Sequence, residues 1–254
     1  MNTAPLTPSP RAVLIGASSG IGAALARQLA ANGYTLALTA RRLEKLTDLC
    51  AEINAQTGRE SARPYPNDVT AYHDAAPLLE RIIADLGGLD AVIYNAGVLH
   101  SVTRDEYNFE KDRAMLETNL LGALAWLNPT AALFEQMGRG QIVGISSIAG
   151  ARGRVGSPAY NTSKAGLDTY LESLRNRLTR HGVNVLTVRP GYVQTEMIRG
   201  ATRAFWVIPA EQAAADIAKA MQRRKQVIYT PARWWWVALA LKHMPSVIFR
   251  RLNV

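Results

Sequence analysis

Residues 12–33, AVLIGASSGIGAALARQLAANG, decide the fold of this chain. The first four are apolar without polar alternation, as in a strand that is covered on both faces of a sheet. Glycines follow at positions 16, 20 and 22, and a helical stretch begins directly after them. Glycines at such a turn let the backbone approach a pyrophosphate, which the free N–H groups and positive end of the helix then bind. The spacing is G-x-x-x-G-x-G rather than G-x-G-x-x-G, and it predicts a dinucleotide site at Gly16, Ser18, Ser19, Gly20, Ile21 and Gly22.

The same alternation of strand and helix continues to residue 230. Apolar runs occur in RAVLIG, YTLALTA, SARPYPND, LDAVIYNAG, QIVGISS, VNVLTVRPG and QVIYT, with helical stretches near 20–32, 42–57, 72–86, 109–137, 158–181 and 210–222. This order predicts an α/β fold with a doubly wound, Rossmann-like parallel β-sheet of seven strands and helices on both faces. Pro64 and Pro66 place the third strand at the sheet edge, because a central strand needs the N–H groups that proline lacks.

No linker rich in Pro, Gly or Ser divides the 254 residues, so we expect a single domain over 11–230. Residues 1–10 are expected to be a flexible N-terminus without the features of a signal peptide, and 231–254 a basic, tryptophan-rich tail. The single cysteine, Cys50, excludes an internal disulfide and fits a reducing compartment, so we expect a cytoplasmic protein. The four histidines are far apart in the sequence, and no metal site is expected.

The net charge of +9 is concentrated near the C-terminus. No acidic residue follows Asp216, whereas eight basic ones do: Lys219, Arg223, Arg224, Lys225, Arg233, Lys242, Arg250 and Arg251. The preceding part is nearly neutral, so the positive charge belongs to one local element. No fold motif for a nucleic-acid partner accompanies it, and we expect no specific nucleic-acid binding.

Arg41 and Arg42 end the second predicted strand, where an NAD-binding protein usually carries an acidic residue for the ribose 2′-hydroxyl. A carboxylate there would repel a 2′-phosphate, whereas a guanidinium pairs with it in a fork. Two arginines that merely open a helix are disfavoured, because cations oppose the dipole at a helix N-terminus. The pair therefore favours NADP(H) over NAD(H).

A second group of polar residues fits proton transfer. Tyr160 and Lys164 are four residues apart in the predicted helix 158–181 and so share one face, and Ser147 follows the fifth strand. Hydride transfer to a carbonyl carbon requires a proton for the oxygen, and a nearby ammonium lowers a tyrosine pKa from its usual value of about 10. Ser147 can hold the substrate oxygen by a hydrogen bond. Tyr-x-x-x-Lys alone is common on helices, and it gains weight here from the glycines and the serine.

With these motifs in this order, the sequence resembles the short-chain dehydrogenase/reductase family, in its compact type of about 250 residues. The resemblance covers residues 11 to about 230. It rests on GASSGIG at 16–22, Arg41-Arg42, Asp68-Val69, Asn95-Ala96-Gly97, Asn119 in TNLLG, Ser147, Tyr160 with Lys164, and Pro190-Gly191-Tyr192-Val193-Gln194-Thr195.

The resemblance implies roles for these residues. Tyr160 would be the general acid/base and Ser147 would orient the carbonyl, while Lys164 would hold the nicotinamide ribose and lower the tyrosine pKa. Asn119 would anchor a water in the proton relay. The expected cofactor contacts are Asp68 and Val69 at the adenine, Asn95, Ala96 and Gly97 along the cofactor, and Val193 and Thr195 at the carboxamide and phosphate end. Pro190 and Gly191 are also expected to bind the cofactor. Asp68 as a helix N-cap and Asn119 as a buried polar group bonded to backbone are the alternatives.

The substrate walls are expected in the loops 98–104, 149–157 and 192–209, beyond the carboxyl ends of the strands. The last loop holds Met197, Ile198, Phe205, Trp206, Val207 and Ile208, which favours a hydrophobic carbonyl substrate, unless these residues only pack against the adjoining helix. Arg152 and Arg154 either form a solvated loop, which is the favoured interpretation, or steer an acidic group.

These features predict an NADP(H)-dependent oxidoreductase that transfers a hydride between nicotinamide and a carbonyl or secondary alcohol, with reduction of a hydrophobic ketone or acyl substrate as the favoured reaction. The alternative is a catalytically silent NADP(H)-binding redox sensor, although Asn119, Ser147, Tyr160 and Lys164 are all present. The resemblance also implies a homodimer or homotetramer.

The tail contains RWWWVALALK at 233–242, whose uncharged run of eight residues is too short for a bilayer span of about 20. Tryptophans and flanking cations without acids are typical of a helix that lies on an anionic membrane surface, which would make the protein peripheral through residues 233–251. Packing against a partner subunit and a flap over the substrate mouth are the alternatives.

Overall fold

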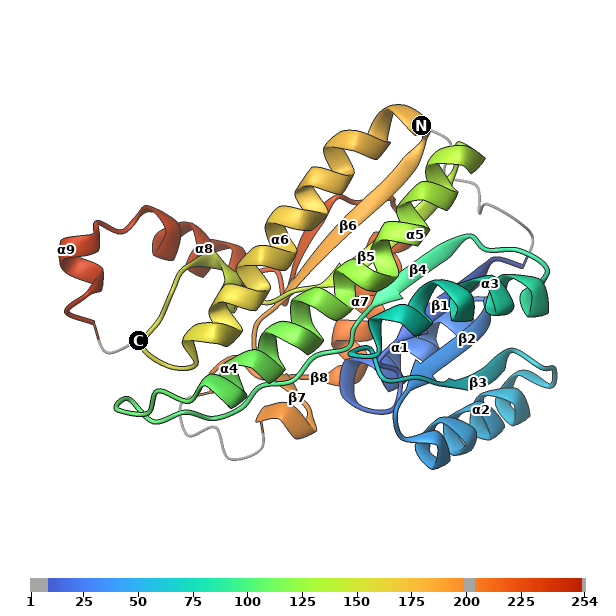
Figure 1. Cartoon of the computed structure of the whole chain (residues 1–254), viewed down its shortest axis with the longest axis horizontal. Coiled ribbons are helices and arrows are strands. Elements are labelled where there is room, and N and C mark those ends of the chain that lie inside the picture. Colours follow the sequence, from blue (N-terminus) through green and yellow to red (C-terminus); the bar gives the residue numbers. More distant parts are fainter. Residues whose placement is uncertain (1–8, 199–203, 253–254) are drawn as a thin grey trace.

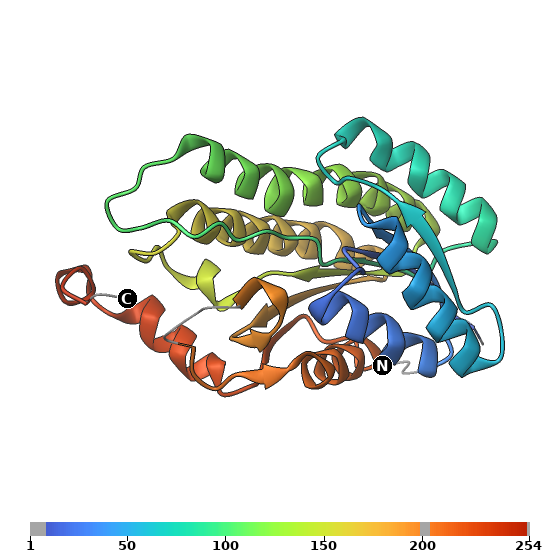
Figure 2. The same ribbon diagram turned by 90° about the horizontal axis from the view of Figure 1, so that it is seen from below.

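A computed structural model describes residues 9–198 and 204–252. Its centre is a parallel β-sheet with a layer of helices on each face (Figure 1). Seen from below, α3, α5 and α6 lie on one side of the sheet, and α1, α2 and α7 lie on the other (Figure 2). The expected α/β fold with helices on both faces is therefore confirmed, while most of the expected flexible N-terminus, residues 1–8, lies outside the described residues.

The sheet has seven strands in the order β3-β2-β1-β4-β5-β6-β9, all parallel. They are β1 (Arg11–Ile15), β2 (Thr35–Ala40), β3 (Ala62–Pro66), β4 (Ala91–Tyr94), β5 (Gly140–Ile145), β6 (Val183–Pro190) and β9 (Val227–Thr230). β3 lies at an edge, as its two prolines predict. The strand order reverses between β1 and β4, and in such sheets the crevice at this point is where ligands bind.

Each face of the sheet carries its own apolar core. One face packs against α1 (Gly20–Ala31), α2 (Leu43–Thr57) and α7 (Ala210–Gln222), and the other against α3 (Ala75–Leu86), α5 (Gly122–Met137) and α6 (Pro158–Leu178). Alternate strand residues divide between the two cores. Ala12 and Leu14 face the core with α1, α2 and α7, and Val13 and Ile15 face the core with α3, α5 and α6. This double burial is the reason that the strands have no polar alternation.

The predicted helix 109–137 contains an irregularity. It consists of α4 (Phe109–Leu116), one π-helical turn over Glu117–Leu121, and α5. Asn119 lies in this π turn and is fully buried. Such turns are rare within helices and frequently occur at functional sites.

The tail forms two short helices, α8 (Trp234–His243) and α9 (Ser246–Phe249), which project beyond the sheet near the start of α6 (Figure 1). Trp234 and Ala238 are buried against Ile148 and Tyr192 in a small apolar cluster. Within residues 9–198 and 204–252, no helix has the length and apolar character needed to cross a bilayer. Because Trp234 and Ala238 are buried in this cluster, α8 docks at least partly on its own chain.

Candidate active site

A cavity of about 660 Å³ lies at the carboxyl ends of the strands, where the sheet order reverses. Nearly all the residues predicted for the site line it: Gly16, Ser18, Ser19, Gly20, Ile21, Arg41, Arg42, Asp68, Val69, Asn95, Ala96, Gly97, Ser147, Tyr160, Lys164, Pro190, Gly191, Val193 and Thr195. Gly22 and Asn119 do not line it. The tertiary structure thus brings together segments that are far apart in the sequence, and it places two predicted residues behind the cavity wall.

The glycine loop between β1 and α1 is packed too closely for side chains. Gly16 has φ +86°, and a Cβ on it would lie 2.5 Å from the backbone nitrogen of Ala96. A Cβ on Gly22 would collide with the carbonyl oxygen of Gly16, so Gly22 is needed for the turn itself. The amide nitrogen of the Asn95 side chain donates to that same oxygen at 2.7 Å. Asn95 therefore holds the loop in place from the end of β4 as well as lining the cavity.

Arg42 points back over the glycine loop. Its guanidinium donates to Ser18 Oγ at 3.0 Å and to Ser19 Oγ at 2.8 Å. It also pairs with the Glu196 carboxylate at 3.2 Å, and Lys45 pairs with the same carboxylate at 3.3 Å. These two cations keep the pKa of Glu196 below its usual value through hydrogen bonds and charge attraction. A surplus of positive charge therefore surrounds this corner of the cavity.

Arg41 has a weaker partner. Its nearest guanidinium nitrogen lies 3.9 Å from the Asp68 carboxylate, and both side chains are exposed. The other Asp68 oxygen accepts from the backbone nitrogen and the hydroxyl of Thr70. Asp68 thus ties the short turn after β3 instead of acting as an N-cap of α3, whose N-cap is Asp74. The helix-capping alternative for Asp68 is wrong.

Tyr160 and Ser147 both line the cavity, and their side chains are hydrogen-bonded to each other. Ser147 leads out of β5, and Tyr160 lies in the first turn of α6, one turn before Lys164. Burial raises the pKa of Tyr160, while a hydrogen bond from Ser147 and the positive charge of Arg154 act in the opposite direction. The sequence predicted a Tyr160 pKa lowered by Lys164, but the pKa of this phenol is raised in the chain itself, because burial outweighs the groups that oppose it. The Tyr160 hydroxyl contacts Met197 Sδ at 4.0 Å.

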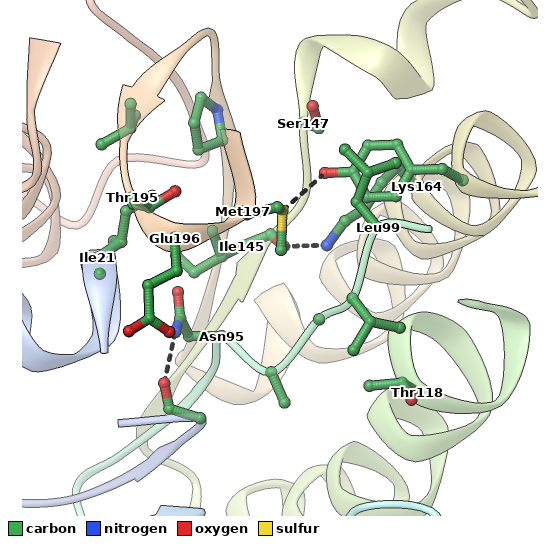
Figure 3. Close-up of a pocket in the computed structure, with 18 of the residues that line it drawn as sticks. Ile21, Asn95, Leu99, Thr118, Ile145, Ser147, Lys164, Thr195, Glu196 and Met197 are labelled. Carbon is green, nitrogen blue, oxygen red and sulfur yellow. Dashed lines mark hydrogen bonds between the residues drawn. The ribbon is translucent and has the colours of Figure 1, made fainter. Parts of the chain in front are cut away.

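Lys164 is buried beneath the site. Its Nζ donates to the carbonyl oxygen of Ile145 at 2.9 Å (Figure 3) and lies 5.9 Å from the centre of the Tyr160 ring. Burial lowers the pKa of Lys164 to about 8, while Asp168 opposes this shift. A Cβ on Gly97 would lie 3.6 Å from Nζ, so a glycine here leaves the ammonium accessible from the cavity.

Asn119 fastens the loop after β4. Its side-chain oxygen accepts from Val98 N at 2.7 Å, and its nitrogen donates to Val98 O at 2.9 Å and to Ser163 Oγ at 3.1 Å. These contacts agree with the alternative of a buried polar group bonded to backbone. A role for Asn119 in a proton relay stays a prediction.

Two residues of this region were missed from the sequence, Asp168 and Glu196. Asp168 is four residues beyond Lys164 on α6, and its carboxylate accepts from Arg189 Nε at 2.9 Å. Arg189 in turn donates to the Tyr229 hydroxyl at 2.8 Å. The spacing of four residues after Lys164 was a usable signal for Asp168. Glu196 gave none, because its partner Arg42 is 154 residues away.

The tail contacts residues of two of the three loops that were expected to form the substrate walls, 149–157 and 192–209. Trp234 is only 3% exposed and packs on Tyr192, Phe205 and Trp206 with ring centres 4.9–5.8 Å apart. Arg152 donates to the carbonyl oxygen of Leu241 at 2.8 Å and to that of Met244. Arg152 therefore caps the end of α8, so neither interpretation made of it from the sequence, a solvated loop or an anion-steering residue, describes it.

No group of three His, Cys, Asp or Glu side chains in the described ranges is arranged to hold a metal ion.

Comparison with known proteins assigns this architecture. The family model described as short chain dehydrogenase matches residues 10–204. An uncharacterized oxidoreductase of Mycobacterium tuberculosis is 32% identical over 229 residues, which cover 89% of this chain and 90% of that protein. An acetoacetyl-CoA reductase of Shinella zoogloeoides is 33% identical over 193 residues, which cover 74% of this chain and 76% of that protein.

Solved structures agree with this assignment. A short-chain dehydrogenase from Sphingobium yanoikuyae in complex with NADPH has a TM-score of 0.81 and 27% identity, with 91% of this chain and 92% of that chain covered. A variant of actinorhodin polyketide ketoreductase with NADPH has a TM-score of 0.80 and 25% identity, with 92% of this chain and 98% of that chain covered.

Proposed function

The chain belongs to the short-chain dehydrogenase/reductase family, and we propose that it is an NADP(H)-dependent enzyme that reduces a hydrophobic ketone or acyl substrate. The observation that carries the proposal is one continuous cavity, with Tyr160, Ser147 and Lys164 at one end and the glycine loop with Arg42 at the other. A silent redox sensor would need the binding end alone. The presence of both ends favours an enzyme.

The binding end fits a dinucleotide. Gly16 and Gly20 leave open backbone at the start of α1, where N–H groups and the helix dipole favour a pyrophosphate. Arg42 lies directly over Ser18 and Ser19 of this loop, within reach of a 2′-phosphate. Preference for NADP(H) rests on this guanidinium and on Lys45 beside it. Two solved neighbours carry NADPH, which agrees with the proposal.

When bound, the nicotinamide supplies or accepts the hydride. The chain provides the rest: the Tyr160 phenol donates a proton to the carbonyl oxygen as the carbon is reduced, and the Ser147 hydroxyl holds that oxygen. Lys164, held by Ile145 O below Tyr160, keeps a positive charge where the phenolate would form. In the direction of alcohol oxidation the proton returns to Tyr160.

The substrate side of the cavity is bordered by apolar side chains. Met197 and Ile198 line the cavity itself, while Phe205, Trp206 and Val207 are exposed near it on the same segment. A small polar substrate would leave this apolar surface in water. A hydrophobic carbonyl compound uses it.

We further propose that the tail binds an anionic membrane surface. Trp236 is 66% exposed, and Trp235, Val247 and Ile248 are also exposed on α8 and α9. The cations of the tail include Arg233 and Lys242, with no acid beyond Asp216, so charge and apolar surface both suit an anionic lipid interface. Flotation with anionic liposomes, compared with a chain truncated after Pro231, tests this, and equal flotation of both contradicts it.

The assembly into a homodimer or homotetramer remains a prediction. Measurement of the molar mass in solution by light scattering tests it.

Activity on a panel of hydrophobic ketones and acyl thioesters, with NADPH and NADH in parallel, tests the main proposal. We expect oxidation of NADPH with at least one member, and a loss of about 10²- to 10⁴-fold in Tyr160→Phe because the proton donor is removed. The phenylalanine keeps the ring, so cofactor binding serves as the control for folding. Binding of NADPH without turnover of any member would instead favour the sensor.

A further inference from the structure

The charges along the cavity are unevenly paired. Four cations line it within the described residues: Arg41, Arg42, Arg154 and Lys164. Only two acids of the described ranges line it, and both lie at the dinucleotide end: Asp68 beside Arg41 and Glu196 beside Arg42. Lys164 has the carbonyl oxygen of Ile145 and, one turn along α6, Asp168. Arg154 is the lining cation for which the described residues provide no ion-pair partner.

Arg154 is partly buried in the loop between Ser147 and α6. The side-chain nitrogen of Asn161 donates to the Arg154 carbonyl at 3.4 Å and to the Gly156 carbonyl at 3.1 Å, which holds the loop against the start of α6. The Arg154 Nε is buried and has no hydrogen-bond partner among the described residues. Arg154 thus lines the cavity with a charge that no acid of the described residues balances, and an anionic ligand in the cavity would balance it.

Arg154 lies near the reacting end of the cavity. It lines the cavity together with Ser157 and Tyr160, and its positive charge opposes the rise in the pKa of Tyr160. The neighbouring Arg152, two residues earlier, is instead engaged by the end of α8 through Leu241 and Met244. The two arginines of ARGRVGS therefore have different surroundings, although they look alike in the sequence.

We propose that Arg154 binds an oxyanion group, a carboxylate or a phosphate, on the carbonyl substrate. The inference rests on the proposed reductase function and narrows its substrate class to amphiphilic compounds. The carbonyl lies at Tyr160, the anionic group pairs with the Arg154 guanidinium, and the apolar part lies along Met197. A guanidinium binds such groups through two parallel hydrogen bonds, which lysine does not reproduce.

A matched pair of substrates tests this inference: a medium-chain keto acid and its methyl ester, which has the same carbon skeleton without the charge. For the wild type with NADPH, we expect kcat/KM to be about 10- to 100-fold higher for the acid. In Arg154→Gln this ratio falls to about 1, mainly through KM of the acid, and Arg154→Lys retains part of it. A keto phosphate in the same series distinguishes phosphate from carboxylate. Arg223→Gln removes an exposed cation outside the cavity and should keep the wild-type ratio.

Binding of the corresponding carboxylic acid without the ketone, measured by calorimetry on the wild type and Arg154→Gln, is independent of turnover. We expect weaker binding in Arg154→Gln by the same factor. Equal binding to both proteins, or equal kcat/KM for acid and ester in the wild type, overturns the inference. If no ketone is turned over while the acid still loses affinity in Arg154→Gln, the anion site stands and the proposed reduction fails.

Discussion

Replacement of Trp234 by alanine should detach the tail from the body of the protein. The indole is almost completely buried, with three aromatic rings around it and the backbone of Gly191 directly beneath. A Cβ on Gly191 would collide with the indole, so Trp234 occupies a space that only a glycine leaves open. The neighbouring Trp235 is 44% exposed and provides a matched control of the same residue type on the same helix.

The size of the effect follows from burial. A tryptophan buries about 150–250 Å². At about 25 cal/mol per Å² this corresponds to about 4–6 kcal/mol, an upper estimate because the detached tail is not fully extended. The indole N–H has no hydrogen-bond partner among the described residues, which offsets about 1–3 kcal/mol. We therefore expect Trp234→Ala to lower the free energy of opening of the tail by about 2–4 kcal/mol.

Hydrogen exchange measured by mass spectrometry reports the free energy of this opening through the exchange rates of the amides. Amides of α8 should exchange about 30- to 700-fold faster in Trp234→Ala, while amides of the central strands keep the wild-type rate because the tail opens locally. Trp235→Ala should change α8 much less. Unchanged exchange in Trp234→Ala, or an equal acceleration in Trp235→Ala, would refute the docking of α8 through Trp234.

Three further outcomes are expected. Gly22→Ala pushes a methyl group against Gly16 and should lower stability by about 1–3 kcal/mol in denaturant unfolding, together with weaker dinucleotide binding. Lys164→Met removes a buried ammonium and should raise the free energy of unfolding at pH 7 by about 3 kcal/mol. That gain should fade between pH 8 and 10.5, because the folded wild-type amine becomes neutral there while the unfolded one still binds its proton; a gain that is independent of pH would contradict this reasoning. Glu196→Gln frees Arg42 and should tighten NADPH binding in fluorescence titrations while leaving NADH binding unchanged.

Contacts between distant segments explain what sequence reasoning missed or misassigned. Glu196 pairs with Arg42, which is 154 residues away in the sequence, and no local spacing predicts such a contact. The pKa of Tyr160 depends on how completely the surrounding chain excludes water, which the one-turn spacing to Lys164 does not contain. Gly22 was expected at the cofactor, but the packing of α1 on the loop places it behind the cavity wall.

The sequence by itself determined the order of strands and helices, the edge position of β3 and the motifs that meet at the carboxyl ends of the strands, because these depend on local periodicity, proline chemistry and chain connectivity. Only the tertiary structure decided which of two similar arginines is engaged by the tail and which faces the cavity. Arg152 and Arg154 have the same chemistry and nearly the same position in the chain. Arg152 binds the end of α8, where Leu241 is 89 residues away in the sequence. The fold of the loop before α6 instead places Arg154 at the cavity that Tyr160 also lines.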